Sequence, residues 1–298
     1  MKELKTIFDL SVNLPKSMIL HKPVVMSFDV TNRCNLKCPM CYWWTRRAKR
    51  EMTLEEIITL FKELRKKGII QCTYVGGEPT LRPDVLEECT RIIPYNWIVT
   101  NGSHKIPNLK NSILILSLDG SKEIHDRIRE KGLYDVVFER FSTRKGIITT
   151  TTLFRWNRNE PEKLLKDWSN TNIAGMTFNF VTPFTDSDNE FCLKWEERDR
   201  TIDRLLKLKR EYKDFLLLSK QQLLSLKKKN VPKWSRDCIV KWFSICIASD
   251  GSLLRPCVLG KHAICSECGC HVPAMINSIY RLDIKGLMPF VRFRDITQ

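Results

Sequence analysis

The sequence predicts an α/β protein in which parallel strands alternate with helices. Two observations carry this prediction. Short apolar or β-branched runs, typical of buried strands, recur at residues 23–31, 69–75, 96–101, 112–119, 146–154 and 173–181. Segments with helical spacing separate most of them, as expected for parallel βα units. Six strands are about two short of a closed eight-stranded barrel.

The segment 52–68 is the clearest of the predicted helices. Apolar residues recur there every three or four positions, at Leu54, Ile57, Ile58, Phe61 and Leu64. Thr53 with Glu56 forms a capping box, and Gly68 suits the end of the helix. Further helices are expected over residues 83–93, 134–144 and 160–168, with one long or two broken helices over 194–230.

Composition and charge narrow the class of protein. Of 298 residues, 43% are hydrophobic and 28% charged, which is ordinary for a globular protein and excludes global disorder. No run of about 18 apolar residues is present, and Glu3 and Asp9 interrupt the N-terminal apolar stretch, so we expect a cytoplasmic protein. Lys and Arg number 50 against 34 Asp and Glu, a net charge of +16 that favours nucleic acid, an anionic membrane surface or a phosphorylated substrate as partner.

The twelve cysteines favour metal binding or catalysis, because disulfides are rare in a reducing compartment. Cys34, Cys38 and Cys41 follow the first predicted strand with the spacing C-x-x-x-C-x-x-C. Three thiolates on one short loop can each bind one iron of a four-iron cluster, which leaves the fourth iron open to a cofactor or substrate. A zinc site or three unconnected thiols are the alternatives.

Three further motifs stand where predicted strands end. They are GGEP (76–79), TNG (100–102) and SLDG (117–120). Paired glycines allow close backbone approach, and Glu78 can accept a hydrogen bond from an ammonium group, although GGEP alone is also typical of a tight turn. Ligands of parallel α/β proteins gather at the carboxyl ends of strands, so these motifs together predict one binding site.

The cysteine motif, GGEP, TNG and SLDG followed by HDRIR resemble the radical S-adenosylmethionine (SAM) enzymes over residues 23–183. This resemblance implies a partial (β/α)6 TIM-like barrel that holds a [4Fe-4S] cluster on Cys34, Cys38 and Cys41. It also implies reductive cleavage of S-adenosylmethionine to methionine and a 5′-deoxyadenosyl radical, which functionalises an unactivated carbon of the substrate.

The resemblance further implies a set of cofactor-binding residues. Gly76, Gly77 and Glu78 would contact the methionine amino group of S-adenosylmethionine. Asn101 and Ser117 would lie near its ribose or methionyl part.

Two other cofactor contacts follow from the same resemblance. Either Arg127 or Arg129 would reach the carboxylate of S-adenosylmethionine. Tyr42, directly after the last cysteine of the motif, looks like the aromatic residue that packs near the adenine. No catalytic side chain is assigned.

Six more cysteines crowd the C-terminal part, at Cys238, Cys246, Cys257, Cys265, Cys268 and Cys270. The segment 247–257, IASDGSLLRPC, resembles the start of the auxiliary-cluster region in SPASM and twitch enzymes, although CSECGC (265–270) lacks the full later cysteine set. We expect at most one auxiliary iron–sulfur cluster, on Cys257, Cys265, Cys268 and either Cys238 or Cys270. The alternatives are free thiols or a zinc knuckle that uses Cys257, Cys265, Cys268 and Cys270 or His271.

Cys246 is the spare cysteine of this group, and Cys72, Cys89 and Cys192 are interpreted as uninvolved thiols. Trp43 and Trp44 precede the basic stretch 46–50, and a second basic surplus lies in 194–230. The first stretch could stack on a nucleic-acid base or contact a lipid surface, or it is an aromatic lip packed on the barrel. The second could contact an anionic membrane surface, or it is a solvated helix face.

These observations predict an N-terminal extension (1–22), a radical SAM core (23–215) and a C-terminal cysteine-rich region (216–298). A weaker resemblance to adenosylhopane synthase and archaeal lipid-modifying enzymes makes a lipid the first expected substrate. The main alternative is a SPASM-type enzyme that modifies a peptide or protein, and RNA is a further candidate substrate. A non-enzymatic protein that binds zinc or nucleic acid is a distant alternative. Ferredoxin or flavodoxin is the expected electron donor.

Overall fold

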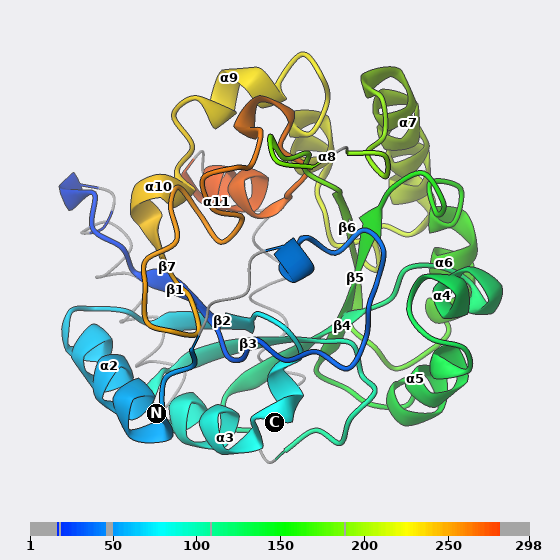
Figure 1. The fold of residues 1–298 in the computed structure, drawn as a ribbon. Coiled ribbons are helices and arrows are strands. Elements are labelled where there is room, and N and C mark those ends of the chain that lie inside the picture. Colours follow the sequence, from blue (N-terminus) through cyan, green and yellow to red (C-terminus); the bar gives the residue numbers. More distant parts are fainter. Residues whose placement is uncertain (1–16, 18, 46–49, 108, 188, 281–298) are drawn as a thin grey trace.

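The structure is a computed structural model that describes residues 17, 19–45, 50–107, 109–187 and 189–280. Seven parallel strands form one curved sheet in the order β6-β5-β4-β3-β2-β1-β7 (Figure 1). The strands are β1 (Val25–Asp29), β2 (Gln71–Val75), β3 (Tyr95–Thr100), β4 (Ser112–Ser117), β5 (Ile147–Leu153), β6 (Gly175–Phe180) and β7 (Ser244–Ile247). The sheet stays open between β6 and β7, so the predicted partial TIM-like barrel is confirmed.

All six predicted strands are present, and β7 is an addition that the sequence did not predict. It pairs in parallel with β1, from Val25 opposite Ser244 to Phe28 opposite Ile247. The strand has only four residues, too few to show a periodic pattern. Because β7 comes from the predicted C-terminal region, that region contributes directly to the sheet of the core, and the predicted domain boundaries stay predictions.

The helices lie outside the sheet or close its open side (Figure 1). They are α2 (Leu54–Lys66), α3 (Pro83–Ile92), α4 (Lys122–Ile128), α5 (Leu133–Phe141), α6 (Pro161–Trp168), α7 (Trp195–Glu211), α8 (Lys220–Ser225), α9 (Val231–Ser235), α10 (Val240–Phe243) and α11 (Val272–Tyr280). Three 3₁₀ turns are η1 (Tyr42–Thr45), η2 (Pro79–Leu81) and η3 (Cys265–Glu267). The Thr53–Glu56 capping box is present at the start of α2. The basic stretch 194–230 is broken into α7 and α8, and α4 was not predicted.

The main core lies between the sheet and the helices. Phe28 of β1 packs edge-on against Phe61 of α2, with ring centroids 5.2 Å apart. Because successive side chains of a strand point to opposite faces, Ser27 and Asp29 of the same strand face the interior of the barrel. The interior wall is therefore more polar at β1 than the wall covered by helices.

The C-terminal segment fills the side of the barrel between β6 and β7 (Figure 1). None of the helices in the described part of the chain is long and apolar enough to cross a membrane. The predicted N-terminal extension falls almost entirely outside the described residues, as does most of the basic stretch 46–50.

Candidate functional site

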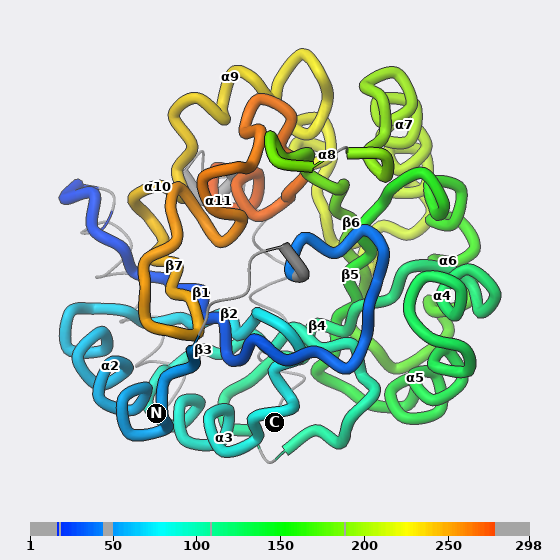
Figure 2. Tube along the Cα trace, viewed as in Figure 1, coloured from blue at the N-terminus to red at the C-terminus, as the bar shows by residue number. Residues whose placement is uncertain are grey.

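The first cysteine motif lies on the loop that follows β1. Figure 2 shows this segment (blue) passing in front of β2, β3 and β4 toward β6. The amide of Cys41 donates to the carbonyl of Cys38 at 3.1 Å, which tightens the loop between these two cysteines. Leu36 is buried in the main core and anchors the loop on the barrel. The loop thus brings the three thiols together above the ends of the strands.

Cys38 is buried, and the neighbouring Cys34 and Cys41 of the same loop are half-buried. Burial raises the pKa of Cys38, and burial raises that of Cys41 to about 11. The Arg129 guanidinium opposes both shifts, while the neighbouring Cys34 adds to them. Thiolates in such a place require nearby positive charge, which a metal centre supplies together with Arg129.

The glycine motif after β2 packs directly against the start of the cysteine loop. The amide of Gly77 donates to the carbonyl of Thr31, and that of Glu78 donates to the carbonyl of Arg33, both at 2.9 Å. A Cβ atom on Gly77 would lie 2.0 Å from the carbonyl oxygen of Arg33. Only glycine permits this approach, so the motif serves to hold the cysteine loop in place.

Glu78 is buried, and its carboxylate is engaged by neighbouring residues. Its Oε1 accepts bonds from the Thr80 amide at 3.1 Å, the Thr80 hydroxyl at 2.6 Å and the Thr100 hydroxyl at 2.7 Å. Its Oε2 accepts a bond from the Asn101 amide at 2.8 Å. Glu78 therefore ties the end of β2 to the end of β3, a role that the sequence did not predict.

Asn101 connects the TNG motif to the cysteine loop. Its Nδ2 donates to Oδ1 of Asn35 at 3.0 Å, and its Oδ1 accepts from the amide of Ser103 at 2.9 Å. Ser117 ends β4 opposite Thr150 of β5 and is half-buried. The structure thus brings Asn101 to the cysteine loop and leaves Ser117 at a strand end of the same edge.

Of the two candidate arginines, Arg129 lies beside the cysteines and Arg127 does not. Arg129 Nε donates to Oδ2 of Asp119 at 2.7 Å, in a pair that is almost fully buried. Arg127 is exposed, and its guanidinium lies 4.6 Å from the ring centre of Trp156. Asp119 was not predicted as a site residue, although it belongs to the SLDG motif that pointed to this strand end.

Tyr42 links the two cysteine-rich parts of the chain. Its ring stacks on Phe184, with centroids 5.8 Å apart. Phe184, in the segment after β6, pairs as an isolated antiparallel bridge with Ala263, which lies two residues before Cys265. The residue expected near the adenine therefore also marks the boundary between the first cysteine loop and the C-terminal segment.

The C-terminal cysteines form a second group on the other side of this contact. Burial raises the pKa of each of Cys238, Cys257, Cys268 and Cys270, and further increases come from mutual electrostatic repulsion within the set of Cys238, Cys257, Cys265, Cys268 and Cys270. Those five are the candidate ligands taken from the sequence. Cys246, on β7, also raises the pKa of Cys257. Cys72 and Cys89 are buried in the main core, as expected.

The thiols of the two groups could serve as ligands of iron–sulfur clusters. Among the described residues, no three His, Cys, Asp or Glu side chains surround one point as ligands of a single ion would. In a four-iron cluster each thiolate binds a different iron, so the sulfur atoms need not converge.

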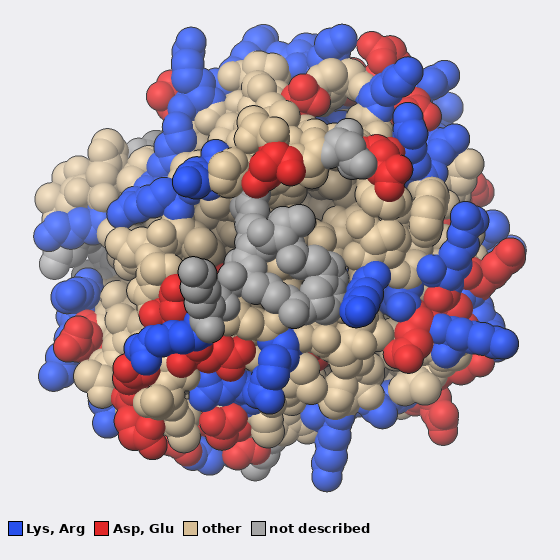
Figure 3. All heavy atoms as spheres, viewed as in Figure 1, with Lys and Arg blue, Asp and Glu red and all other residues tan. Residues whose placement is uncertain are grey.

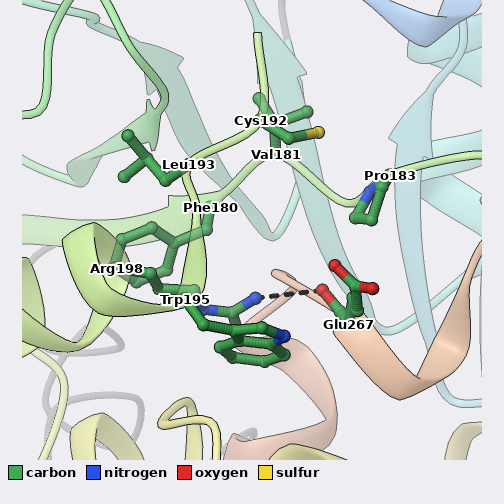
Figure 4. A pocket seen from close by; sticks show the side chains of 8 residues that line it. All are labelled: Phe180, Val181, Pro183, Cys192, Leu193, Trp195, Arg198 and Glu267. Carbon is green, nitrogen blue, oxygen red and sulfur yellow. Dashed lines mark hydrogen bonds between the residues drawn. The ribbon is translucent and has the colours of Figure 1, made fainter. Parts of the chain in front are cut away.

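Arg198 is a buried residue of the C-terminal contact that sequence reasoning missed, because it lies in the basic stretch interpreted as a solvated helix face. It borders a small cavity of about 10 Å³ with Phe180, Val181, Pro183, Cys192, Leu193, Trp195 and Glu267 (Figure 4). Burial lowers the pKa of Arg198 to about 10. Its burial becomes visible only in the folded structure, where it contacts Glu267 and Cys268, which are far away in sequence.

Lys and Arg do not form one continuous patch on the face of the molecule shown in Figure 3. On the face in Figure 3, Lys and Arg lie mostly around the rim with Asp and Glu among them. Part of the surplus in 194–230 is paired locally, since Lys228 contacts Glu196 at 3.4 Å. Arg50 pairs with Glu56 at 2.8 Å. The pair in 194–230 favours the solvated-face interpretation of that stretch, whereas residues 46–49 of the other basic stretch lie outside the described residues.

Comparison with known proteins gives a family match in the first half of the chain. The pattern of the Radical SAM superfamily matches residues 28–167. A probable GTP 3′,8-cyclase of Thermococcus kodakarensis is 40% identical over 88 residues, which cover 28% of this chain and 29% of that protein. A cysteine-type anaerobic sulfatase-maturating enzyme of Clostridium novyi is 27% identical over 276 residues, 76% of this chain and 71% of the relative.

The similarity to a solved structure extends over most of the chain. Streptococcus suis SuiB bound to the precursor peptide SuiA aligns with a TM-score of 0.61 and 13% identity, over 90% of this chain and 69% of that one. At this identity the likeness concerns the fold. This chain spans about a third or less of the length of several curated relatives, including the cyclase.

Proposed function

The chain belongs to the Radical SAM superfamily, with a [4Fe-4S] cluster and S-adenosylmethionine as its cofactors, and we propose that it is an enzyme that modifies a peptide or protein by radical chemistry. The observation that carries the proposal is the clamped cysteine loop. Backbone bonds from Gly77 and Glu78 and a side-chain bond from Asn101 hold this loop over the strand ends. The bound cofactors supply a one-electron reductive cleavage of S-adenosylmethionine.

The residues of this chain would hold and orient those cofactors. Cys34, Cys38 and Cys41 would each bind one iron of the cluster. Arg129, fixed by Asp119 beside these thiols, is positioned to offset negative charge there, whether of the cluster or of the S-adenosylmethionine carboxylate. Because Arg127 is exposed over Trp156, we assign the carboxylate contact to Arg129.

The remaining cofactor contacts follow the motif positions. Gly76 and Gly77 would present their backbone to the methionine amino group, and Ser117 would face the ribose or methionyl part. Tyr42 would pack near the adenine. Since the carboxylate of Glu78 already accepts four hydrogen bonds, we propose that it acts chiefly by shaping the backbone around the cofactor.

A peptide or protein substrate has more support than the lipid expected first from the sequence. One relative, which shares 71% of its length with this chain, is named for maturing a sulfatase. One solved structure of similar fold is bound to a precursor peptide. The ion pairs within the basic stretch also leave less free positive charge for an anionic membrane.

We further propose that the second cysteine group binds one auxiliary iron–sulfur cluster. Cys257, Cys265 and Cys268 would be ligands, with Cys238 or Cys270 as the fourth. Four cysteines would close the cluster and suit it to electron transfer or structure. A ferredoxin or flavodoxin is the proposed electron donor for the enzyme.

Anaerobic assay of the reconstituted protein tests the enzymatic part. With S-adenosylmethionine and dithionite, the wild type should release 5′-deoxyadenosine, and Cys34→Ala should abolish the release. Cys89→Ala is the matched control, because this thiol is buried on α3 in the core and belongs to neither cysteine group. Equal release by wild type and Cys34→Ala would contradict the proposed cluster site.

Mass spectrometry tests the substrate class. Peptides, proteins and lipids are compared between cells that carry the wild-type gene and cells that carry the Cys34→Ala gene. The proposal expects a mass change in a peptide or protein that depends on Cys34. A Cys34-dependent change confined to lipids would overturn the peptide proposal and restore the lipid substrate.

A further inference from the structure

A single buried arginine joins the barrel to the second cysteine group. Arg198 lies in the first turn of α7 and is 4% exposed. Its Nη1 donates to the carbonyl of Glu267 at 2.9 Å, and its Nη2 donates to the carbonyl of Cys268 at 2.6 Å. Figure 4 shows the guanidinium directed at Glu267 across the small cavity. One side chain thereby fixes both peptide bonds that flank Cys268.

Two aromatic rings hold the guanidinium in place. It lies 4.9 Å from the ring centre of Phe180, at the end of β6, and 4.6 Å from that of Trp195, in its own helix. Such contacts favour a cation over a neutral side chain. Arg198 is therefore held by residues of the barrel and α7 as well as by its hydrogen bonds to the cysteine segment.

The same cysteine segment is attached to β6 on its other side. The amide of Phe180 donates to the carbonyl of Gly269 at 2.9 Å, and the amide of Gly269 donates to the hydroxyl of Thr182 at 2.9 Å. A Cβ atom on Gly269 would lie 2.0 Å from the carbonyl oxygen of Phe180. Cys268 is thus held between a glycine pressed against β6 and two hydrogen bonds from Arg198.

The charge of Arg198 is offset by nearby groups and not by a direct ion pair within the described part of the chain. It takes part in none of the ion pairs found among the described residues, and its Nε is buried without a hydrogen-bond partner. A buried cation is costly unless negative charge lies nearby. The groups that favour the cation are Cys268, then Asp199, Glu267 and Cys192. A cluster bound by Cys268 would add further negative charge beside the guanidinium.

We propose that Arg198 is the positioning residue of the auxiliary cluster: it fixes Cys268 for iron binding, and its charge stabilises the reduced cluster. The inference rests on the proposed auxiliary cluster of the second cysteine group. Hydrogen bonds, net charge and solvent exposure set the potentials of iron–sulfur clusters. A fixed cation beside one ligand therefore raises the reduction potential and retains the cluster.

The test uses a parent protein in which Cys34, Cys38 and Cys41 are all changed to Ala, so that any cluster present belongs to the second group. Iron and sulfide content of the reconstituted parent decides whether that group holds a cluster. A parent without iron would contradict the auxiliary cluster itself, whereas a loaded parent allows Arg198 to be examined separately.

Arg198→Met removes the charge and Arg198→Lys keeps it without the paired hydrogen bonds. We expect Arg198→Met to lose iron to a chelator about tenfold faster than the parent, the scale typical of residues that support metal ligands. Its cluster should have a lower midpoint potential by spectroelectrochemistry. Arg198→Lys should keep the potential near that of the parent while losing iron faster.

Arg200→Met, on the exposed face of the same helix, is the matched control and should behave as the parent does. Circular dichroism checks that each variant is folded. If Arg198→Met does not fold, Arg198→Lys alone decides through its rate of iron loss. Unchanged iron retention and potential in the folded variants would overturn the proposal.

Discussion

Replacing Glu78 by Gln tests whether this carboxylate shapes the site or is kept free for a ligand. The amide oxygen can keep the three bonds now made by Oε1, to the amide and hydroxyl of Thr80 and the hydroxyl of Thr100. The amide nitrogen then faces the Asn101 amide and leaves a buried donor unpaired, at a cost of about 1–3 kcal/mol. With weaker bonds at the other three donors, we expect a loss of about 3 kcal/mol in the free energy of unfolding.

Urea unfolding of the metal-free, reduced protein measures this loss without any contribution from cofactors. Glu88→Gln is the control, since the Glu88–Arg91 pair is exposed and should contribute less than about 1 kcal/mol. If Glu78→Gln is as stable as Glu88→Gln, the carboxylate is not structural. The reasoning that removes it from direct cofactor binding would then be wrong.

Three further predictions concern the same edge of the barrel. Gly77→Ala should displace the cysteine loop, and iron analysis should show loss of the first cluster with little change in the second. Arg129→Met should cost about 3–5 kcal/mol in urea unfolding because it leaves buried Asp119 unpaired, whereas Arg127→Met should cost less than about 1 kcal/mol. Burial, followed by the charge of Arg129, lowers the pKa of His125 to about 3, so the folded protein keeps this side chain neutral while the unfolded chain binds a proton below about 6.5. Stability should therefore fall by up to about 1.4 kcal/mol per unit as pH drops from about 6 toward 3. His125→Asn should flatten that slope in unfolding curves measured at pH 6.5 and 5; an equally steep slope in the variant would contradict a neutral His125.

Most of the sheet was predictable because its strands carry their own signal. Buried parallel strands are rich in apolar and β-branched residues, and six of them were visible as such runs. The helix α2 was also predictable, since Thr53 and Glu56 cap it locally. In contrast, β7 is short, and its pairing with β1 depends on residues more than 200 positions apart. No local pattern reports such a pairing.

Some residues of the candidate site could also be predicted from local sequence, and others could not. The sequence could place Cys34 and Gly77 at strand ends, because the motifs are contiguous. It could not decide between Arg127 and Arg129, since two residues of separation on a short helix reverse the direction of a side chain. The sequence did not predict the burial of Arg198 because the burial of a charged residue depends on tertiary contacts. Its neighbours in sequence are charged and half-buried or exposed.

The attachment of the second cysteine group to β6 has a consequence for biosynthesis. The hydrogen bonds of Gly77 and Asn101 that clamp the loop of the first cluster have both partners synthesised once residue 101 is complete. The second group needs His271, whose amide donates to Asn179 across a separation of 92 residues. At about 5–20 residues per second, roughly 10 to 30 seconds of translation separate the two events. We therefore expect the first cysteine loop to be competent for iron loading while the second is still being made.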